Sequence, residues 1–213
     1  MQNASRTYLA LGDSYTAGEG VAARESWPHV LNGLLEARGH RLDLSVVART
    51  GWTAAELHEA ARNAPLPAKP ALTTLLVGVN DQYRGLPIES FREELGRLLE
   101  LVAGRGPSSR LLVLSIPDWG VTPFATGRDR AAIALSIDSF NETARTLALA
   151  SGARWIDITP LAREAAGNPA LLAGDGLHFS PLAHRLLAES ALSPALEILE
   201  VSPEGFPQRE GFA

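Results

Sequence analysis

The chain has 213 residues, 46% of them hydrophobic, with a formal net charge of −5 at pH 7 and no cysteine. This length and composition predict one globular domain with a sizeable core. The lack of cysteine excludes disulfide scaffolds, thiolate metal sites and cysteine nucleophiles. The acidic charge balance argues against nucleic acid as a partner, because proteins that bind a phosphate backbone usually carry a basic face.

Hydropathy predicts a soluble protein without a membrane span, because no run approaches the ~18 uncharged apolar residues that crossing a bilayer requires. The N-terminus is polar, and the apolar run after it is too short for a secretory signal. We therefore expect a cytoplasmic location. We expect a single catalytic domain over residues 1–200 and a polar C-terminal tail over residues 201–213.

Short apolar runs of β type alternate along the chain with longer segments of helical period. The predicted strands are Thr7 to Gly12, Leu42 to Ala48, Leu72 to Val79, Arg110 to Ile116 and Arg154 to Ile158. The predicted helices are Ser26 to Arg38, Thr53 to Asn63, Ile88 to Val102, Asp129 to Ala150 and Pro181 to Leu192. A loop containing Pro and Gly, Pro117 to Arg128, separates the fourth strand from its helix and is a candidate lid or substrate wall.

This alternation predicts an α/β domain, a doubly wound three-layer α/β/α sandwich with a five-stranded parallel sheet. In such sheets ligands bind at the carboxyl ends of the strands. Functional residues are therefore expected just after each strand.

A serine follows the first predicted strand, in the segment Gly12-Asp13-Ser14-Tyr15. A serine at the carboxyl end of a strand presents its hydroxyl at the ligand-binding edge of the sheet, where a nucleophile would lie. The same tetrapeptide also fits a serine that caps a helix.

A histidine follows the last predicted strand, in the segment Asp175-Gly176-Leu177-His178. Imidazole accepts and returns a proton near neutral pH, which a serine nucleophile requires. A carboxylate three residues earlier can orient the ring and stabilise the imidazolium. Taken alone, Asp175 and His178 also fit ordinary turn residues.

Two potential hydrogen-bond donors follow the second and third strands, Gly51 and Asn80. A backbone N–H and an amide side chain can stabilise the oxyanion of a tetrahedral intermediate. Each is an ordinary turn residue by itself. Ser14, Gly51, Asn80 and His178, however, each follow a different predicted strand, and together they are the groups that an acyl-transfer site needs.

The segments GDSY, GWT, GVND and DGLH resemble, in order and position, the four sequence blocks of the SGNH hydrolase superfamily, the GDSL-type esterases and lipases. The resemblance extends from Leu9 to His178. It implies a flavodoxin-like sandwich and a catalytic triad of Ser14, His178 and Asp175. It also implies an oxyanion hole formed by the backbone amides of Ser14 and Gly51 and the side chain of Asn80, and no cofactor.

Two positions depart from the family pattern. Tyr15 replaces the leucine of the first block, and Ala48-Arg49-Thr50 replaces the asparagine that often precedes the glycine of the second block. The first departure changes the wall beside the nucleophile, and the second changes the residues that lead into Gly51.

The expected function is a serine esterase that acts on a small acyl ester, with a lysophospholipase or thioesterase of the same mechanism as the closest alternative. Aromatic residues near the strand ends are candidates for the substrate pocket: Tyr15, Trp52, Tyr83, Trp119 and Phe124. The lack of a long apolar lid predicts a preference for short acyl chains.

Two alternatives belong to other classes. A metal-dependent phosphoesterase would need Asp13, Asp81, Asp175 and His178 to converge as ligands, although most two-metal sites use more than one histidine. A non-catalytic flavodoxin-like module could bind a flavin or nucleotide at the same strand ends, but the chain lacks the glycine fingerprint of dinucleotide sites.

Overall fold

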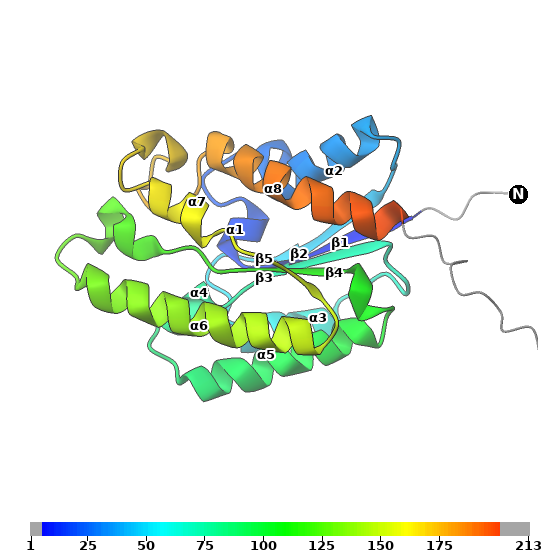
Figure 1. Ribbon diagram of the computed structural model, residues 1–213, viewed down its shortest axis with the longest axis horizontal. Helices are drawn as coiled ribbons and strands as arrows, with labels where there is room; N and C mark the ends of the chain where they lie inside the picture. The colour runs from blue at the N-terminus through cyan, green and yellow to red at the C-terminus, as the bar shows by residue number, and fades with distance from the viewer. Residues whose placement is uncertain (1–5, 201–213) are drawn as a thin grey trace, which may run out of the picture.

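The computed structural model describes residues 6–200, which form a five-stranded, wholly parallel sheet with helices on both faces (Figure 1). The strand order is β2-β1-β3-β4-β5, the doubly wound order of flavodoxin-like proteins. The predicted fold class is confirmed. The predicted tail, residues 201–213, lies outside the described residues.

The strands are short and mostly buried. They are β1 (Thr7–Gly12), β2 (Asp43–Ala48), β3 (Leu72–Leu76), β4 (Leu111–Leu114) and β5 (Arg154–Ile156). Every residue of β3 and β4 is buried, as expected for central strands covered on both faces. The last three strands end earlier than predicted, because their apolar runs continue past the sheet into the turns that build its carboxyl edge.

The long helices match the predicted segments to within one residue, with one exception. They are α2 (Trp27–Ala37), α3 (Ala54–Asn63), α5 (Ile88–Ala103), α6 (Arg130–Ala150) and α8 (Pro181–Glu200). The prediction ended α8 at Leu192, but the helix continues through Pro194. The buried Ala195, Ile198 and Leu199 beyond it offset the cost of an interior proline, about 3 kcal/mol.

Short helical segments at the ends of the strands were not predicted. They are α1 (Ser14–Ala17), α4 (Val79–Tyr83) and α7 (Thr159–Glu164), with 3-10 turns at η1 (Ala23–Glu25), η2 (Ser108–Arg110), η3 (Trp119–Val121), η4 (Pro123–Ala125) and η5 (Pro169–Leu171). Helices of four to six residues carry too little apolar periodicity to be recognised in a sequence. Several of them line the functional edge of the sheet.

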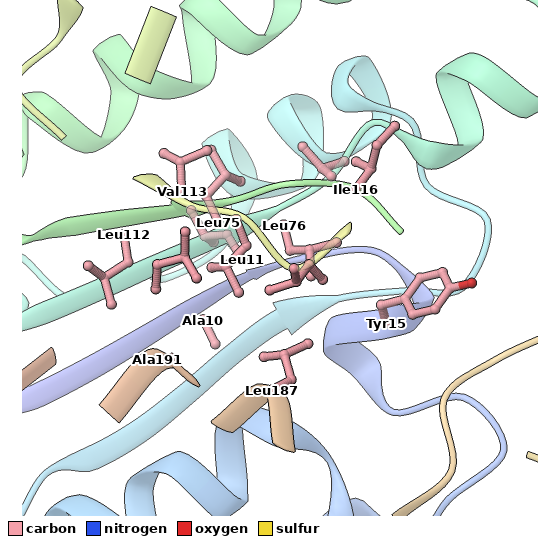
Figure 2. Close-up of a cluster of buried hydrophobic side chains, with 14 of the residues drawn as sticks. Ala10, Leu11, Tyr15, Leu75, Leu76, Leu112, Val113, Ile116, Leu187 and Ala191 are labelled. Carbon is pink, nitrogen blue, oxygen red and sulfur yellow. The ribbon is translucent and has the colours of Figure 1, made fainter. Parts of the chain in front are cut away.

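The two layers of helices enclose the sheet (Figure 1). Helices α2 and α8 cover one face, and α3, α5 and α6 cover the other. In Figure 2, Leu187 and Ala191 of α8 approach the sheet from one side, and Tyr15 of α1 lies at the end of the sheet. Both ends of the described chain lie at the amino edge of the sheet, where Arg6 donates a hydrogen bond to the carbonyl of Leu199. The carboxyl edge therefore lies opposite the termini.

No helix among the described residues is long and apolar enough to cross a membrane.

Candidate functional site

A cavity of about 170 Å³ opens at the carboxyl edge of the sheet. Its lining comes from the loops and short helices that follow the five strands: Ser14, Tyr15, Thr50, Gly51, Val79, Asn80, Tyr83, Trp119, Phe124, Leu177 and His178. The structure thus brings Ser14, Gly51, Asn80 and His178 together, as the order of the sequence blocks suggested.

Ser14 is the first residue of α1, and only Asp13 separates it from the end of β1. Its backbone N–H has no acceptor within the helix because it belongs to the first turn. The tight junction depends on Gly12, where a Cβ atom would lie 2.2 Å from Thr16 Oγ1 and 2.5 Å from the carbonyl oxygen of Leu76. Asp13, not Ser14, caps the helix by accepting a hydrogen bond from the Tyr15 amide, so the serine hydroxyl is not needed as the cap.

His178 and Asp175 form a hydrogen-bonded pair, with Nδ1 of the ring 2.6 Å from Oδ2 of the carboxylate. The other carboxylate oxygen of Asp175 accepts hydrogen bonds from the amides of Leu177 and His178. Burial works to raise the pKa of Asp175, but these three hydrogen bonds outweigh it and lower that pKa. Asp175 is therefore held ionised behind the ring, in the position of an orienting group.

Tyr15 packs against His178 and the segment that carries it. Its ring centroid lies 5.3 Å from that of His178 and 5.0 Å from that of Phe179, and its hydroxyl donates a hydrogen bond to the carbonyl of Leu177. The departure from the family's leucine thus adds a buried ring that contacts the segment carrying His178. Tyr15 also lines the cavity, so it contributes to both the wall and the support of the site.

Helix α4 and the residue that follows it hold the Gly51 loop through three hydrogen bonds. Asn80 Nδ2 donates to the carbonyl of Trp52 at 2.9 Å, and Asp81 Oδ2 accepts from the amide of Ala54 at 2.9 Å. Arg84 Nη2 donates to the carbonyl of Gly51 at 2.6 Å. Gly51 has φ = +89°, a conformation that favours glycine. These contacts fix the Gly51 backbone beside Asn80, whose second Nδ2 hydrogen stays available for another acceptor.

The roles of Asp81 and Arg84 in holding the loop were not predicted. The sequence prediction extended the third strand to Val79, whereas the strand ends at Leu76 and Val79 begins α4. In a strand or turn, the four-residue spacing from Asn80 to Arg84 does not place the two side chains side by side. Had α4 been recognised, that spacing would have placed both side chains on one helix face.

The aromatic candidates separate into two groups. Tyr15, Tyr83, Trp119 and Phe124 line the cavity, and the loop after β4 supplies Trp119 and Phe124 as one of its walls. Trp52 is not among the residues that line this cavity, and its role in substrate binding stays a prediction. Its side chain is partly buried and packs against the hydrophobic core, and its carbonyl accepts the hydrogen bond from Asn80.

The four residues of the metal hypothesis have separate partners: Asp13 caps α1, Asp81 binds the Ala54 amide, and Asp175 pairs with His178. Over residues 6–200, no three His, Asp or Glu side chains are grouped so that they could hold a metal ion. The convergence that the metal-dependent alternative requires is therefore not found in this part of the chain.

Comparison with known proteins agrees with the geometry. The profile of the GDSL-like lipase/acylhydrolase family matches residues 10–186, so the chain belongs to that family. An arylesterase of Vibrio mimicus is 29% identical over 121 residues, and the esterase TesA of Pseudomonas aeruginosa is 28% identical over the same length. Each alignment covers 54% of this chain and 57% or 58% of the relative, so the chain matches little more than half the length of either.

Solved structures share the fold at lower identity. The psychrotrophic esterase EstA from Pseudoalteromonas sp. superposes with a TM-score of 0.71 at 19% identity, covering 92% of this chain and 99% of that one. The acetylxylan esterase Axe2 from Geobacillus stearothermophilus superposes with a TM-score of 0.70 at 19% identity, covering 92% and 96%.

Asp13 is an unusual neighbour for the candidate nucleophile, because it is fully buried and its Oδ2 has no hydrogen-bond partner among the described residues. Burial raises the pKa of Asp13 to about 8, although the Tyr15 amide opposes this; the charge of Asp81 raises it further. Asp13 is therefore protonated at neutral pH in the folded protein.

The buried Asp13 predicts a pH-dependent stability. Between pH 4 and pH 8 the folded state keeps a proton that the unfolded chain has lost, so stability falls as pH rises. Relative to Asp13→Asn, which keeps the capping oxygen, the free energy of unfolding of the wild type should fall by up to about 1.4 kcal/mol per pH unit in this range. Urea unfolding of both proteins at several pH values measures the difference. Parallel pH curves would contradict the prediction.

Proposed function

We propose that the protein is a serine esterase that hydrolyses carboxylic esters through an acyl-enzyme intermediate. Ser14 is the nucleophile, His178 the general base and acid, and Asp175 the group that orients His178. The observation that carries the proposal is the 2.6 Å contact between Asp175 and the Nδ1 side of His178, with the ring and Ser14 both facing one cavity. Family membership supports the same chemistry.

The reaction follows from the arrangement of these groups. Ser14 Oγ attacks the ester carbonyl carbon while Nε2 of His178 takes the hydroxyl proton, which is then delivered to the departing alkoxide. The histidine next removes a proton from water, and the resulting hydroxide attacks the acyl carbon. The bond from that carbon to Ser14 Oγ then breaks, the acid leaves, and His178 returns the proton to Ser14 Oγ. Asp175 stabilises the imidazolium in both halves and keeps the proton on Nδ1.

Three donors around the cavity are proposed to bind the oxyanion: the backbone N–H groups of Ser14 and Gly51 and the Nδ2 of Asn80. The contacts from Asn80 and Arg84 to the Gly51 loop fix two of these donors before the substrate binds. Such preorganisation lowers the barrier because no reorganisation is needed when the charge develops.

The first test is chemical labelling. A fluorophosphonate should form one covalent adduct on Ser14, identified by peptide mass spectrometry, and Ser14→Ala should reduce kcat on p-nitrophenyl acetate by about 10⁴-fold or more. Ser139→Ala, an exposed serine on α6, is the matched control and should keep both properties. An unlabelled Ser14, or a fully active Ser14→Ala protein, would refute the nucleophile.

The oxyanion role of Asn80 predicts a loss in kcat. Asn80→Ala should lower kcat about 100-fold to 1,000-fold with a much smaller change in KM, because the lost interaction develops in the transition state. The exposed Asn63→Ala at the end of α3 serves as the control. Thermal melting of each variant shows whether the loop contact of Asn80 also contributes to stability. A large rise in KM at unchanged kcat would count against the assignment.

The cavity volume predicts the acyl preference. A cavity of about 170 Å³ is close to the engineered cavity of about 150 Å³ that holds a benzene molecule, so it accommodates a short acyl chain or a single ring. In a series of p-nitrophenyl esters, kcat/KM should be highest for chains of about two to six carbons. A maximum at ten or more carbons would instead favour the lysophospholipase or thioesterase alternative.

A further inference from the structure

Three aromatic side chains form a continuous cluster on one wall of the cavity. The ring centroids of Tyr83 and Trp119 lie 5.3 Å apart, and Phe124 lies 5.9 Å from Tyr83 and 6.0 Å from Trp119. Trp119 is 4% exposed and its Nε1 donates to Gln82 Oε1 at 2.7 Å, whereas Tyr83 and Phe124 are 42% and 43% exposed. Trp119 is therefore buried and held in place, whereas the rings of Tyr83 and Phe124 are exposed and can contact a ligand.

Arg128 lies over this cluster. Its Cζ is 5.6 Å from the centroid of Tyr83 and 5.7 Å from that of Trp119. Both rings line the cavity, so the guanidinium is held near its rim. A guanidinium that packs on aromatic rings keeps its N–H groups free for in-plane hydrogen bonds, and it is a preferred partner of carboxylates.

The charge of Arg128 is not neutralised within the part of the chain that the structure describes. None of the ion pairs among residues 6–200 includes Arg128. The adjacent carboxylate, Asp129, accepts a hydrogen bond from Ala132 as the N-cap of α6. By contrast, Arg130 donates to the carbonyls of Gly120 and Thr122 and so holds the loop itself. The Arg128 guanidinium is thus positioned by the two rings, and no hydrogen bond or ion pair to another residue of the 6–200 region engages it.

We propose that Arg128 makes this site selective for esters that carry an anionic group on the arm lying against the aromatic cluster. The inference rests on the proposed esterase function and specifies its substrate class. The apolar rings bind the body of the arm, and the guanidinium meets a carboxylate at its far end. Because the contact is at a solvent-exposed rim, its effect is moderate, and it acts on selectivity and not on the chemical step.

The test compares matched charged and neutral esters. For a charge on the alcohol side, the pair is 4-acetoxybenzoate and 4-acetoxybenzamide. For a charge on the acyl side, the pair is the p-nitrophenyl monoester of adipic acid and p-nitrophenyl hexanoate. Each kcat/KM is measured for the wild type, Arg128→Gln, Arg128→Lys and Arg145→Gln. The last is the control, because it removes an equal charge from an exposed position near the other end of α6.

The quantity that decides is the charged-to-neutral ratio of kcat/KM, compared between variant and wild type so that intrinsic ester reactivity cancels. In at least one pair, Arg128→Gln should lower this ratio about threefold to tenfold. Arg128→Lys should lower it less, and Arg145→Gln should leave it unchanged. Ratios in both pairs that stay within twofold of the wild type in Arg128→Gln would overturn the proposal.

Failure of the inference differs from failure of the proposed function. If the esterase assignment is wrong, the wild type hydrolyses none of the four esters faster than Ser14→Ala does. If only the role of Arg128 is wrong, the wild type hydrolyses the neutral esters through Ser14 while the ratios do not depend on residue 128.

Discussion

The parallel direction of all five strands is the constraint on which the site depends. A parallel strand needs a crossover to return the chain, and in this protein helices supply the crossovers on both faces of the sheet. Every strand consequently ends at the same edge, and five loops that are distant in sequence meet there. The chemistry of the site is assembled by the sheet rather than by any one segment.

The rigidity of this edge comes from hydrogen bonds between neighbouring loops. Helix α4 and the residue that follows it bind the Gly51 loop through side chains of Asn80, Asp81 and Arg84, whereas Asp13 and Asp175 each bind amides of their own turns. Burial raises the pKa of Asp81 to about 6, although the hydrogen bond from the Ala54 amide lowers it in part. Buried carboxyl groups are costly, and at this edge their oxygens accept backbone amides that would otherwise lack an acceptor.

Much of this arrangement could be predicted from the sequence because it depends on long, periodic elements. The apolar runs of β3 and β4 and the amphipathic α5 and α6 define the sheet and its layers without reference to distant contacts. The residues that meet at the carboxyl edge follow from the strand ends. Recognition of the four sequence blocks supplied the roles expected of Gly51 and Asn80, which are otherwise ordinary turn residues.

What could not be predicted depends on short elements and tertiary contacts. Helix α4 has five residues and continues an apolar run, so its first residue, Val79, was assigned to the strand. The packing of the Trp52 side chain against the hydrophobic core is a tertiary contact that no periodicity reveals. The position of Arg128 over two rings of the same wall requires α4 and the loop after β4 to meet in space.

The contact between Tyr15 and the segment carrying His178 has a consequence for biosynthesis. The tyrosine hydroxyl bonds to the carbonyl of Leu177, 162 positions later in the chain. A ribosome therefore completes the serine-bearing turn, the central strands and most of the helices before the histidine segment exists. The set of side chains that line the cavity is therefore complete only when the chain has been made as far as His178.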